Sequence, residues 1–202
     1  MRVLLVEDHP TMRLGIRAAL GLADDVEVVA EAIGAGDVLH LNQKLKPDIV
    51  LLDLHLGGEP RGAEICRRIK ELPDPPRILV YSAYNSEEDI LLCRLSGADG
   101  YLHKSEGPEK LLEALREVHR GGRLWLEGRE EGHPGLQDVP GITHLTPKEK
   151  EVLLLLLERC SNAQIAEQLY ISERTAKFHV KNILKKLGFS SRRALFRHLT
   201  GS

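Results

Sequence analysis

The first 120 residues of this 202-residue chain alternate between short apolar runs and amphipathic stretches, and this alternation constrains the fold most strongly. Five segments have the near-unbroken apolar character of buried strands: Arg2–Val6, Val26–Ala30, Ile49–Leu52, Ile78–Tyr81 and Gly100–Leu102. Helical periodicity occupies the stretches between and after them: Thr11–Leu20, Asp37–Lys44, Gly62–Lys70, Glu87–Leu95 and Pro108–Arg120. Strands that are apolar on both faces and separated by helices indicate a parallel sheet covered on both sides. We therefore predict a doubly wound α/β domain, whose ligands bind beyond the carboxyl ends of the strands.

The predicted strands end in residues suited to metal and phosphate chemistry. Glu7 and Asp8 follow the first strand and Asp53 the third, while Ser82 ends the fourth and Lys104 follows the fifth. Clustered carboxylates raise one another's pKa unless a cation lies among them, and a few hard oxygen ligands completed by water suit Mg²⁺. Any one acidic residue is equally well explained as a cap of the next helix. The five residues together favour one shallow Mg²⁺ site.

A second pattern, at residues 145–186, predicts three helices in close succession. Thr146 is placed as an N-cap, and Glu149, three residues later, completes a capping box. A short helix is expected around Asn162–Leu169, followed by a turn and a longer helix capped by Ser172.

The last of these helices has two different faces. Its apolar residues recur at helical spacing and are expected to point inward: Ala176, Val180, Ile183, Leu184 and Leu187. Lys177, Lys181 and Lys185 are left pointing outward. A short helix, a tight turn and a cation-lined second helix predict a helix-turn-helix, whose second helix enters the major groove of DNA. The alternative is an ordinary helical hairpin with solvated lysines.

The charge is divided unevenly along the chain. Residues 146–202 carry eleven Lys or Arg and five Asp or Glu, a net +6, which leaves net −8 for residues 1–145. A basic segment joined to an acidic one predicts that only the C-terminal part contacts phosphates. Three widely spaced cysteines and the lack of a signal peptide or long apolar run predict a soluble cytoplasmic protein that does not enter the membrane.

The C-terminal segment resembles the DNA-binding domain of NarL/FixJ (LuxR-type) transcriptional regulators. The residues that carry the resemblance are Leu145-Thr146-Pro147, Glu149, Glu151-Val152-Leu153, Ser161-Asn162, Ile165-Ala166, Leu169, Ile171-Ser172, Thr175, Lys177, His179-Val180, Asn182-Ile183, Lys186-Leu187-Gly188 and Ser190-Ser191-Arg192. It departs from the family at Arg159-Cys160, where a Gly-Leu-like pair is usual, at Ala176 and at Phe178.

This resemblance assigns roles on DNA. It implies that Lys177, Phe178 and Lys181 approach base edges. It also implies that Ser161, Asn162 and Thr175 hold phosphates.

The N-terminal part, over about residues 1–120, resembles the receiver domain of two-component response regulators. The matching pieces are V-L-L-V-E-D-H-P (3–10), D-I-V-L-L-D-L (48–54), V-Y-S-A (80–83) and G-A-D-G-Y-L-H-K (97–104). The resemblance implies a flavodoxin-like (βα)5 fold with a parallel five-stranded sheet.

The receiver resemblance also assigns the site. It implies that Asp53 is the phosphoacceptor and that Glu7, Asp8, Asp53 and the backbone carbonyl of His55 serve Mg²⁺. Ser82 and Lys104 would contact the phosphoryl group, and Tyr101 would be the switch aromatic.

His55 and Tyr84 occupy the positions that in receivers flank the path of attacking water. A bulky aromatic there should hinder the water, so we expect slow dephosphorylation; the alternative is that His55 orients the water. The chain departs from the receiver pattern in one loop. The loop after Asp53 contains Gly57-Gly58, lacks the usual proline and is one residue longer, which predicts a looser carbonyl ligand.

The sequence thus predicts a receiver domain at residues 1–122, a linker at 123–143 and a small all-α helix-turn-helix domain at 144–202. The predicted function is that of a two-component response regulator. Mg²⁺-dependent phosphorylation of Asp53 by a histidine kinase would control sequence-specific binding to double-stranded promoter DNA, and with it transcription. The chain is expected to catalyse only its own phosphoryl transfer and dephosphorylation.

The expected partners are the kinase, DNA and, after phosphorylation or on DNA, a second copy of the chain that contacts Arg192–Leu199; RNA polymerase is a further candidate. One alternative is a phosphorelay protein whose C-terminal part only scaffolds. Another is a regulator controlled by protein partners without phosphorylation. The set of Glu7, Asp8, Asp53, Ser82 and Lys104 weighs against the second alternative.

Overall fold

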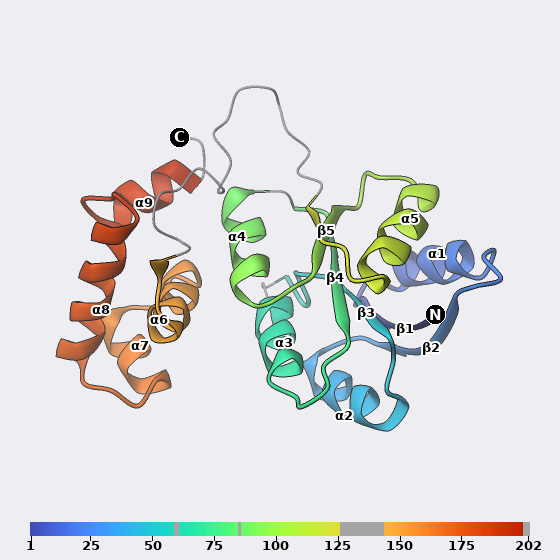
Figure 1. Ribbon diagram of the computed structural model, residues 1–202, viewed down its shortest axis with the longest axis horizontal. Helices are drawn as coiled ribbons and strands as arrows, with labels where there is room; N and C mark the ends of the chain where they lie inside the picture. The colour runs from blue at the N-terminus through green and yellow to red at the C-terminus, as the bar shows by residue number, and fades with distance from the viewer. Residues whose placement is uncertain (59–60, 85, 126–143, 200–202) are drawn as a thin grey trace. The chain divides into compact units, whose positions relative to one another are not determined.

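The computed structural model describes residues 1–58, 61–84, 86–125 and 144–199, which fall into two compact units (Figure 1). One unit comprises Met1–Asn85 and Ser96–Gly128, and the other comprises Ser86–Leu95 and Arg129–Ser202. Among the described helices, none is both long enough and apolar enough to cross a membrane.

The first unit is built on a parallel six-stranded sheet with the order β2-β1-β3-β4-β5-β6. The strands are β1 (Arg2–Val6), β2 (Glu27–Ala32), β3 (Ile49–Leu52), β4 (Arg77–Ser82), β5 (Gly100–His103) and β6 (Leu124–Trp125). The flavodoxin-like class is confirmed, but the prediction of five strands is wrong. The additional strand, β6, pairs with the edge strand β5 and is too short to show any alternation in the sequence. Its two residues lie inside the predicted linker, of which residues 126–143 lie outside the described part of the chain.

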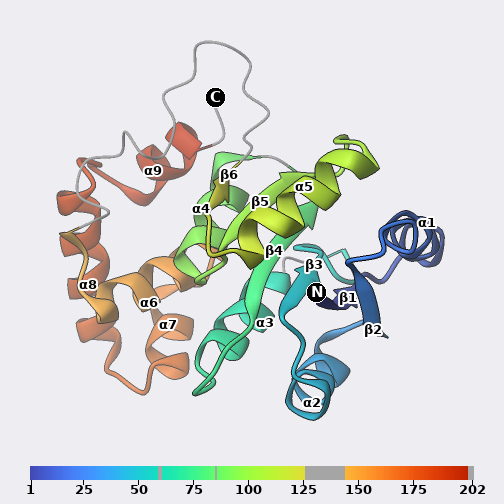
Figure 2. The same ribbon diagram turned by 45° about the vertical axis from the view of Figure 1, so that its right-hand side comes forward.

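Helices cover both faces of this sheet, as the apolar strands require. The helices of this unit are α1 (Pro10–Leu20), α2 (Ala35–Leu45), α3 (Arg61–Lys70) and α5 (Pro108–His119). The helix α4 (Glu87–Leu95) lies between β4 and β5 in the sequence and is grouped with the second unit. In Figures 1 and 2, α1 and α5 lie on one face of the sheet, and α2 and α3 lie on the other. Val3 and Leu5 of β1 pack with Leu20 and Leu115 in one buried cluster between the sheet and the α1–α5 layer.

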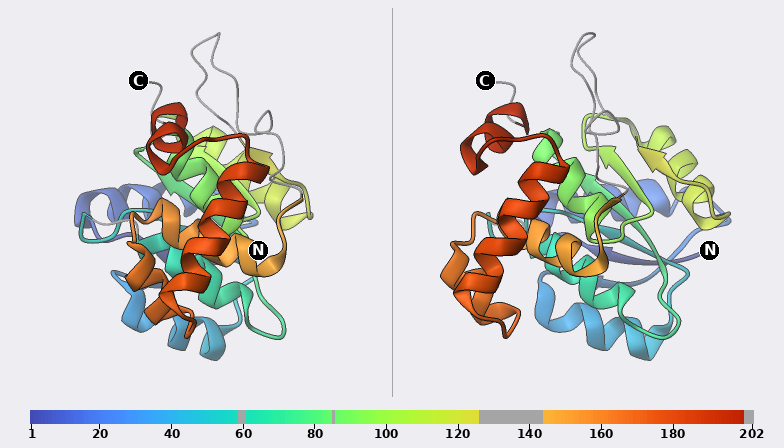
Figure 3. Two further views of the ribbon diagram at one scale, coloured as in Figure 1. Left: turned by 90° about the vertical axis from the view of Figure 1, so that its left-hand side faces the viewer. Right: turned by 60° about the vertical axis from the view of Figure 1, so that its left-hand side comes forward.

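The C-terminal residues form four helices, α6 (Pro147–Leu157), α7 (Asn162–Gln168), α8 (Glu173–Lys186) and α9 (Arg192–Leu199). The predicted capping box at Thr146 and Glu149 is confirmed, and Ser172 caps α8 as expected. A second capping box, at Ser161 and Gln164, opens α7. Figure 3 shows α7 and α8 joined by a short turn, with α6 packed beside α8. This is the helix-turn-helix that the sequence predicts.

Three of these helices end in the same way. After α6, α7 and α8 the chain enters the left-handed region at Arg159 (φ 62°), Tyr170 (φ 52°) and Gly188 (φ 79°). In each case the next backbone N–H donates to the carbonyl five residues earlier, as Ile171 does to Ala166 at 3.0 Å. This hydrogen-bond pattern defines the Schellman motif, in which glycine is the usual left-handed residue. Only α8 has glycine there.

Candidate functional site

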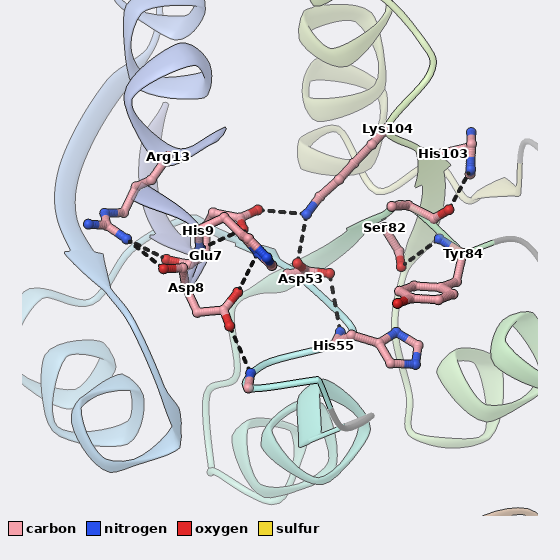
Figure 4. Close-up of polar contacts among 12 residues, drawn as sticks. Glu7, Asp8, His9, Arg13, Asp53, His55, Ser82, Tyr84, His103 and Lys104 are labelled. Atoms are coloured by element: carbon pink, nitrogen blue, oxygen red, sulfur yellow. Dashed lines mark hydrogen bonds and ion pairs between the residues drawn. The ribbon is translucent and has the colours of Figure 1, made fainter. Parts of the chain in front are cut away.

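Backbone hydrogen bonds at the ends of the strands include the site residues and fix the backbone position of each one. The Glu7 N–H donates to the Ala32 carbonyl at 3.1 Å, and the Asp53 N–H donates to the Val6 carbonyl at 2.9 Å. The Lys104 N–H donates to the Ser82 carbonyl at 2.8 Å. The site residues are therefore anchored at the carboxyl ends of the strands by the same kind of bond that holds the sheet together. Figure 4 shows their side chains gathered at this place.

Lys104 joins two of the predicted carboxylates. Its Nζ lies 2.7 Å from Oε2 of Glu7 and 2.6 Å from Oδ2 of Asp53. The side chains of Lys104, Glu7 and Asp53 are 8%, 1% and 5% exposed. Charges this well shielded from water interact more strongly than surface pairs, and removing one partner leaves the other uncompensated.

The environment changes the pKa of both partners in this contact. Burial raises the pKa of Asp53, and the hydrogen bond from Lys104 only partly opposes the effect. Burial alone would lower the pKa of Lys104, but the hydrogen bonds to Asp53 and Glu7 outweigh burial and raise it. Lys104 is therefore a firmly protonated ammonium group at neutral pH.

Asp8 is held by the loop that follows Asp53. The Gly57 N–H donates to Oδ2 of Asp8 at 2.8 Å. Burial would raise the pKa of Asp8, but this bond and the nearby His9 lower it. Gly57 and Gly58 have φ of 68° and 78°, which glycine adopts without strain. The two glycines form a turn through which the loop contacts Asp8, and the predicted looseness of the carbonyl ligand stays a prediction.

His9 was not predicted as part of the site. Its Nδ1 lies 2.9 Å from Oδ1 of Asp8 and 3.3 Å from Oε1 of Glu7. Potential ligand atoms of Glu7, Asp8, His9 and Asp53 all lie within 4.8 Å of one another. The sequence could have indicated His9, because it directly follows Glu7-Asp8. Residues that follow one another just after β1 bring their side chains to the same end of the strand.

The Ser82 side of the site contains two aromatic rings in contact, tilted by 37° to one another. Ser82 is fully buried, and its Oγ accepts the Tyr84 N–H at 3.2 Å. The ring of Tyr84 lies 4.0 Å from that of His55, whose backbone N–H donates to Oδ1 of Asp53 at 3.2 Å. Figure 4 shows this ring pair on the side of Asp53 opposite Glu7. Tyr101, the predicted switch aromatic, is fully buried in β5.

A glycine sets the close approach of α3 to the site. The Gly62 N–H donates to the Leu54 carbonyl at 2.9 Å. A Cβ at Gly62 would lie 2.7 Å from Leu54 Cα and 2.8 Å from Leu54 O, and closer still to the Asp53 carbonyl oxygen. Any side chain at position 62 must therefore displace the backbone that carries Asp53.

On α8, the predicted inward and outward faces are both present. Ala176 and Ile183 are fully buried, whereas Lys177, Phe178 and Lys181 are exposed. Phe178 is 60% exposed, an unusual position for a large apolar ring. The exposed face thus combines two cations with one apolar surface.

The residues predicted to hold phosphates take part in local hydrogen bonds. Ser161 caps α7 by accepting the Gln164 N–H, and the Thr175 hydroxyl lies 2.7 Å from Oγ of Ser172. Oδ1 of Asn162 accepts a hydrogen bond from the Arg192 guanidinium. These three side chains are therefore held in fixed positions near the ends of α7 and α8.

Comparison with known proteins identifies both units. The family model described as the response regulator receiver domain matches residues 3–116. The model described as bacterial regulatory proteins, luxR family, matches residues 143–199.

Relatives and solved structures match along the whole chain. The nitrate/nitrite response regulator protein NarL of Escherichia coli (strain K12) is 37% identical over 199 residues, covering 94% of this chain and 90% of the relative. The transcriptional regulatory protein LiaR of Bacillus subtilis (strain 168) is 34% identical over 200 residues, covering 95% and 93%. The structure of RcsB from Salmonella enterica serovar Typhimurium, bound to a promoter, matches with a TM-score of 0.68 at 28% identity, covering 100% and 99%. The chain therefore belongs to the LuxR-type two-component response regulators, transcription regulators that join a receiver domain to a helix-turn-helix domain.

Proposed function

We propose that Asp53 accepts the phosphoryl group that controls this regulator. The observation that supports this most directly is the position of Lys104 Nζ, within 2.7 Å of carboxylate oxygens of both Glu7 and Asp53. One ammonium group neutralises part of the acidic cluster and leaves a carboxylate at the strand end, where a phosphodonor can reach it.

The proposed reaction is a phosphoryl transfer to a carboxylate. An oxygen of Asp53 attacks phosphorus, the bond from phosphorus to the donor's leaving group breaks, and an aspartyl phosphate forms. The donor is a phosphohistidine of a kinase or a small phosphodonor. Lys104 stabilises negative charge on the transferring oxygens, because its ammonium group is already held at the point where that charge gathers.

The residues present fit a magnesium ion. Glu7, Asp8 and Asp53 supply the hard carboxylate oxygens that Mg²⁺ prefers, and their ligand atoms lie within 4.8 Å of one another. The backbone carbonyl of His55 is the proposed fourth protein ligand. When bound, the ion supplies charge neutralisation for the transferring group.

Ser82 and Tyr101 form the proposed link from the phosphoryl group to the rest of the receiver. In the structure the Ser82 hydroxyl accepts the Tyr84 N–H. We propose that the hydroxyl proton is donated to a phosphoryl oxygen, which pulls the end of β4 toward Asp53. The neighbouring strand β5, which carries Tyr101, then adjusts.

The output is proposed to be DNA binding through α8. Lys177, Phe178 and Lys181 are exposed on one helix of a domain with a net charge of +6 over residues 146–202. Solved neighbours include two RcsB dimers bound to two parallel DNAs, which supports DNA and a second copy as partners. We assign the contact between copies to α9 and keep the histidine kinase and RNA polymerase as further proposed partners.

Phosphorylation is tested with a small radiolabelled phosphodonor and Mg²⁺. Asp53→Asn should abolish labelling, whereas Asp74→Asn, which changes a carboxylate in the loop between α3 and β4, should leave it unchanged. Stoichiometric labelling of Asp53→Asn at another residue contradicts the assignment. Omission of Mg²⁺ should stop labelling of the wild type.

The DNA-contacting face is tested by binding to a selected site and to random duplex. Lys177→Ala and Lys181→Ala should weaken the selected site by about tenfold or more relative to random duplex, because a lysine on a guanine edge contributes about 1–3 kcal/mol of discrimination. Lys148→Ala is the matched control, since Lys148 pairs with Glu151 on α6 at 2.8 Å. Equal losses on both duplexes would show that the two lysines contact phosphates only.

A further inference from the structure

Tyr170 has a backbone conformation that disfavours tyrosine. It is the left-handed residue of the Schellman motif that ends α7, with φ of 52°. A Cβ is unfavourable there, so glycine or asparagine is the usual choice and a bulky residue is a conformational outlier. The equivalent residue after α8 is Gly188, at φ of 79°.

The equivalent residue after α6 shows how a side chain can offset this cost. Arg159 also has a left-handed conformation, and its guanidinium carbon lies 3.5 Å from the centre of the Phe196 ring. That cation–π contact with α9 is a gain that glycine could not provide. Tyr170 is different, because it is 96% exposed and no side-chain contact to it is present in the described part of the chain.

The position of Tyr170 points to a partner outside the chain. It lies two residues before Ser172, the N-cap of α8, so it is at most about 7 Å of extended chain from the start of that helix. The N-terminal residues of a recognition helix contact the bases, which places the end of α8 that follows Tyr170 against DNA. The surrounding positions Leu169, Ile171 and Ser172 follow the LuxR-type pattern, and Tyr170 is the residue among them that the pattern does not specify.

We propose that Tyr170 contacts the DNA backbone, with its hydroxyl donating to a phosphate oxygen. Tyrosine hydroxyls are common donors to phosphate and sugar oxygens, and such contacts position a protein without reading sequence. The contact offsets the unfavourable backbone conformation only when DNA is bound. The inference rests on the proposed DNA binding through α8.

Two substitutions in the full-length chain separate a binding role from a structural one. Tyr170→Phe keeps the ring and the backbone conformation but removes the hydroxyl. Tyr170→Asn also removes the hydroxyl, and it places a residue suited to the left-handed region at the end of α7. Gly188→Asn is the matched control, because it introduces asparagine at the equivalent position after α8.

Binding is measured by fluorescence anisotropy on random duplex at several salt concentrations, alongside thermal unfolding. Tyr170→Phe should bind about tenfold more weakly, as expected for loss of a hydrogen bond to a charged group, with the melting temperature unchanged. The salt dependence of its binding should equal that of the wild type, because a neutral hydroxyl releases no counterion. Tyr170→Asn should melt at a higher temperature and yet bind as weakly as Tyr170→Phe. Gly188→Asn should bind as the wild type does.

Three results would overturn the inference. Wild-type affinity in Tyr170→Phe would show that the hydroxyl makes no contact with DNA. Loss of thermal stability together with affinity in Tyr170→Asn would show that Tyr170 has a structural role. Unchanged DNA binding with altered self-association, measured by sedimentation, would assign Tyr170 to a contact between copies. Failure of the proposed function gives a different result, because the wild type would then bind no duplex at all. Failure of the Tyr170 inference alone leaves DNA binding by the wild type intact.

Discussion

Gly62→Ala is predicted to destabilise the receiver unit although alanine favours helices. The added Cβ would lie 2.7 Å from Leu54 Cα and 2.8 Å from Leu54 O, and both are backbone atoms that cannot rotate away. Overpacking of this kind costs about 1–3 kcal/mol, and its relief by moving α3 would break the hydrogen bond from Gly62 to Leu54, for about 1 kcal/mol more. The alanine substitution recovers about 0.4–1 kcal/mol of chain entropy. The net expectation is a loss of roughly 1–3.5 kcal/mol in the free energy of unfolding.

Gly15→Ala is the matched control, because the two substitutions are chemically identical. Gly15 is in α1, and a Cβ built there meets nothing within 4 Å. Its replacement should stabilise the receiver unit by about 0.5–1 kcal/mol, the usual difference between alanine and glycine within a helix. The two variants are therefore expected to shift stability in opposite directions.

The assay is urea unfolding followed by the fluorescence of Trp125. This is the only tryptophan in the chain, and it lies in β6 beside β5, so its signal reports the receiver unit. A difference in midpoint at unchanged slope measures the change in stability. An unfolding midpoint for Gly62→Ala at or above that of the wild type would refute the argument from close approach.

Three further predictions concern the aspartyl phosphate, the C-terminal domain and one surface ion pair. Tyr84→Ala removes the ring that lies 4.0 Å from His55, and it should shorten the half-life of the phosphorylated protein at least about threefold, a barrier change of roughly 0.7 kcal/mol. Measured loss of label over time decides this, and an unchanged half-life excludes shielding by the ring. The hydrogen bonds from Lys186 and from the Thr146 N–H lower the pKa of Glu149. The stability that Glu149 contributes is therefore present above the ordinary glutamate pKa and is lost as pH falls through the lowered value. Glu149→Gln should lower the free energy of unfolding by about 1 kcal/mol at neutral pH, measured as faster amide hydrogen exchange in α6. In acid the variant and the wild type should exchange at the same rate. The Arg116 side chain lowers the pKa of Asp25 to about 2, and Arg116→Gln should return it toward 3.8 in an NMR titration. The stability that depends on Asp25, present above 3.8 and lost as pH falls toward 2, should disappear in the same variant; an unshifted Asp25 pKa would contradict the assignment to Arg116.

The sequence predicted best those elements whose residues are buried on both faces. The bounds expected for β1 and β3 are the ones observed, because unbroken apolar character begins and ends with the strand. The two-residue strand β6 escaped prediction because its pairing depends on β5 rather than on its own pattern. Trp125, expected to pack at the domain edge, is half-buried within that strand.

Parts of the site could be predicted from the chain order of the strands, and parts depended on tertiary geometry. Glu7, Asp53 and Lys104 follow strands whose carboxyl ends share one edge, so their convergence could be inferred. The hydrogen bond from the Gly57 N–H to Asp8 depends on left-handed conformations at both Gly57 and Gly58. Two adjacent glycines allow these conformations but do not impose them, so the bond could not be predicted. The left-handed conformation of Tyr170 had no sequence signal, because its residue type opposes it.

The contact between Lys104 and Glu7 has a consequence for the order in which a newly made chain folds. These residues are 97 positions apart, and Lys104 and Asp53 are 51 apart. While the ribosome has released only β1 and β3, two carboxylates meet without their ammonium partner, and their mutual repulsion disfavours closure of that edge. The acidic edge therefore becomes stable only after β5 has been released, whereas the short-range contacts of α6, α7 and α8 form quickly once released.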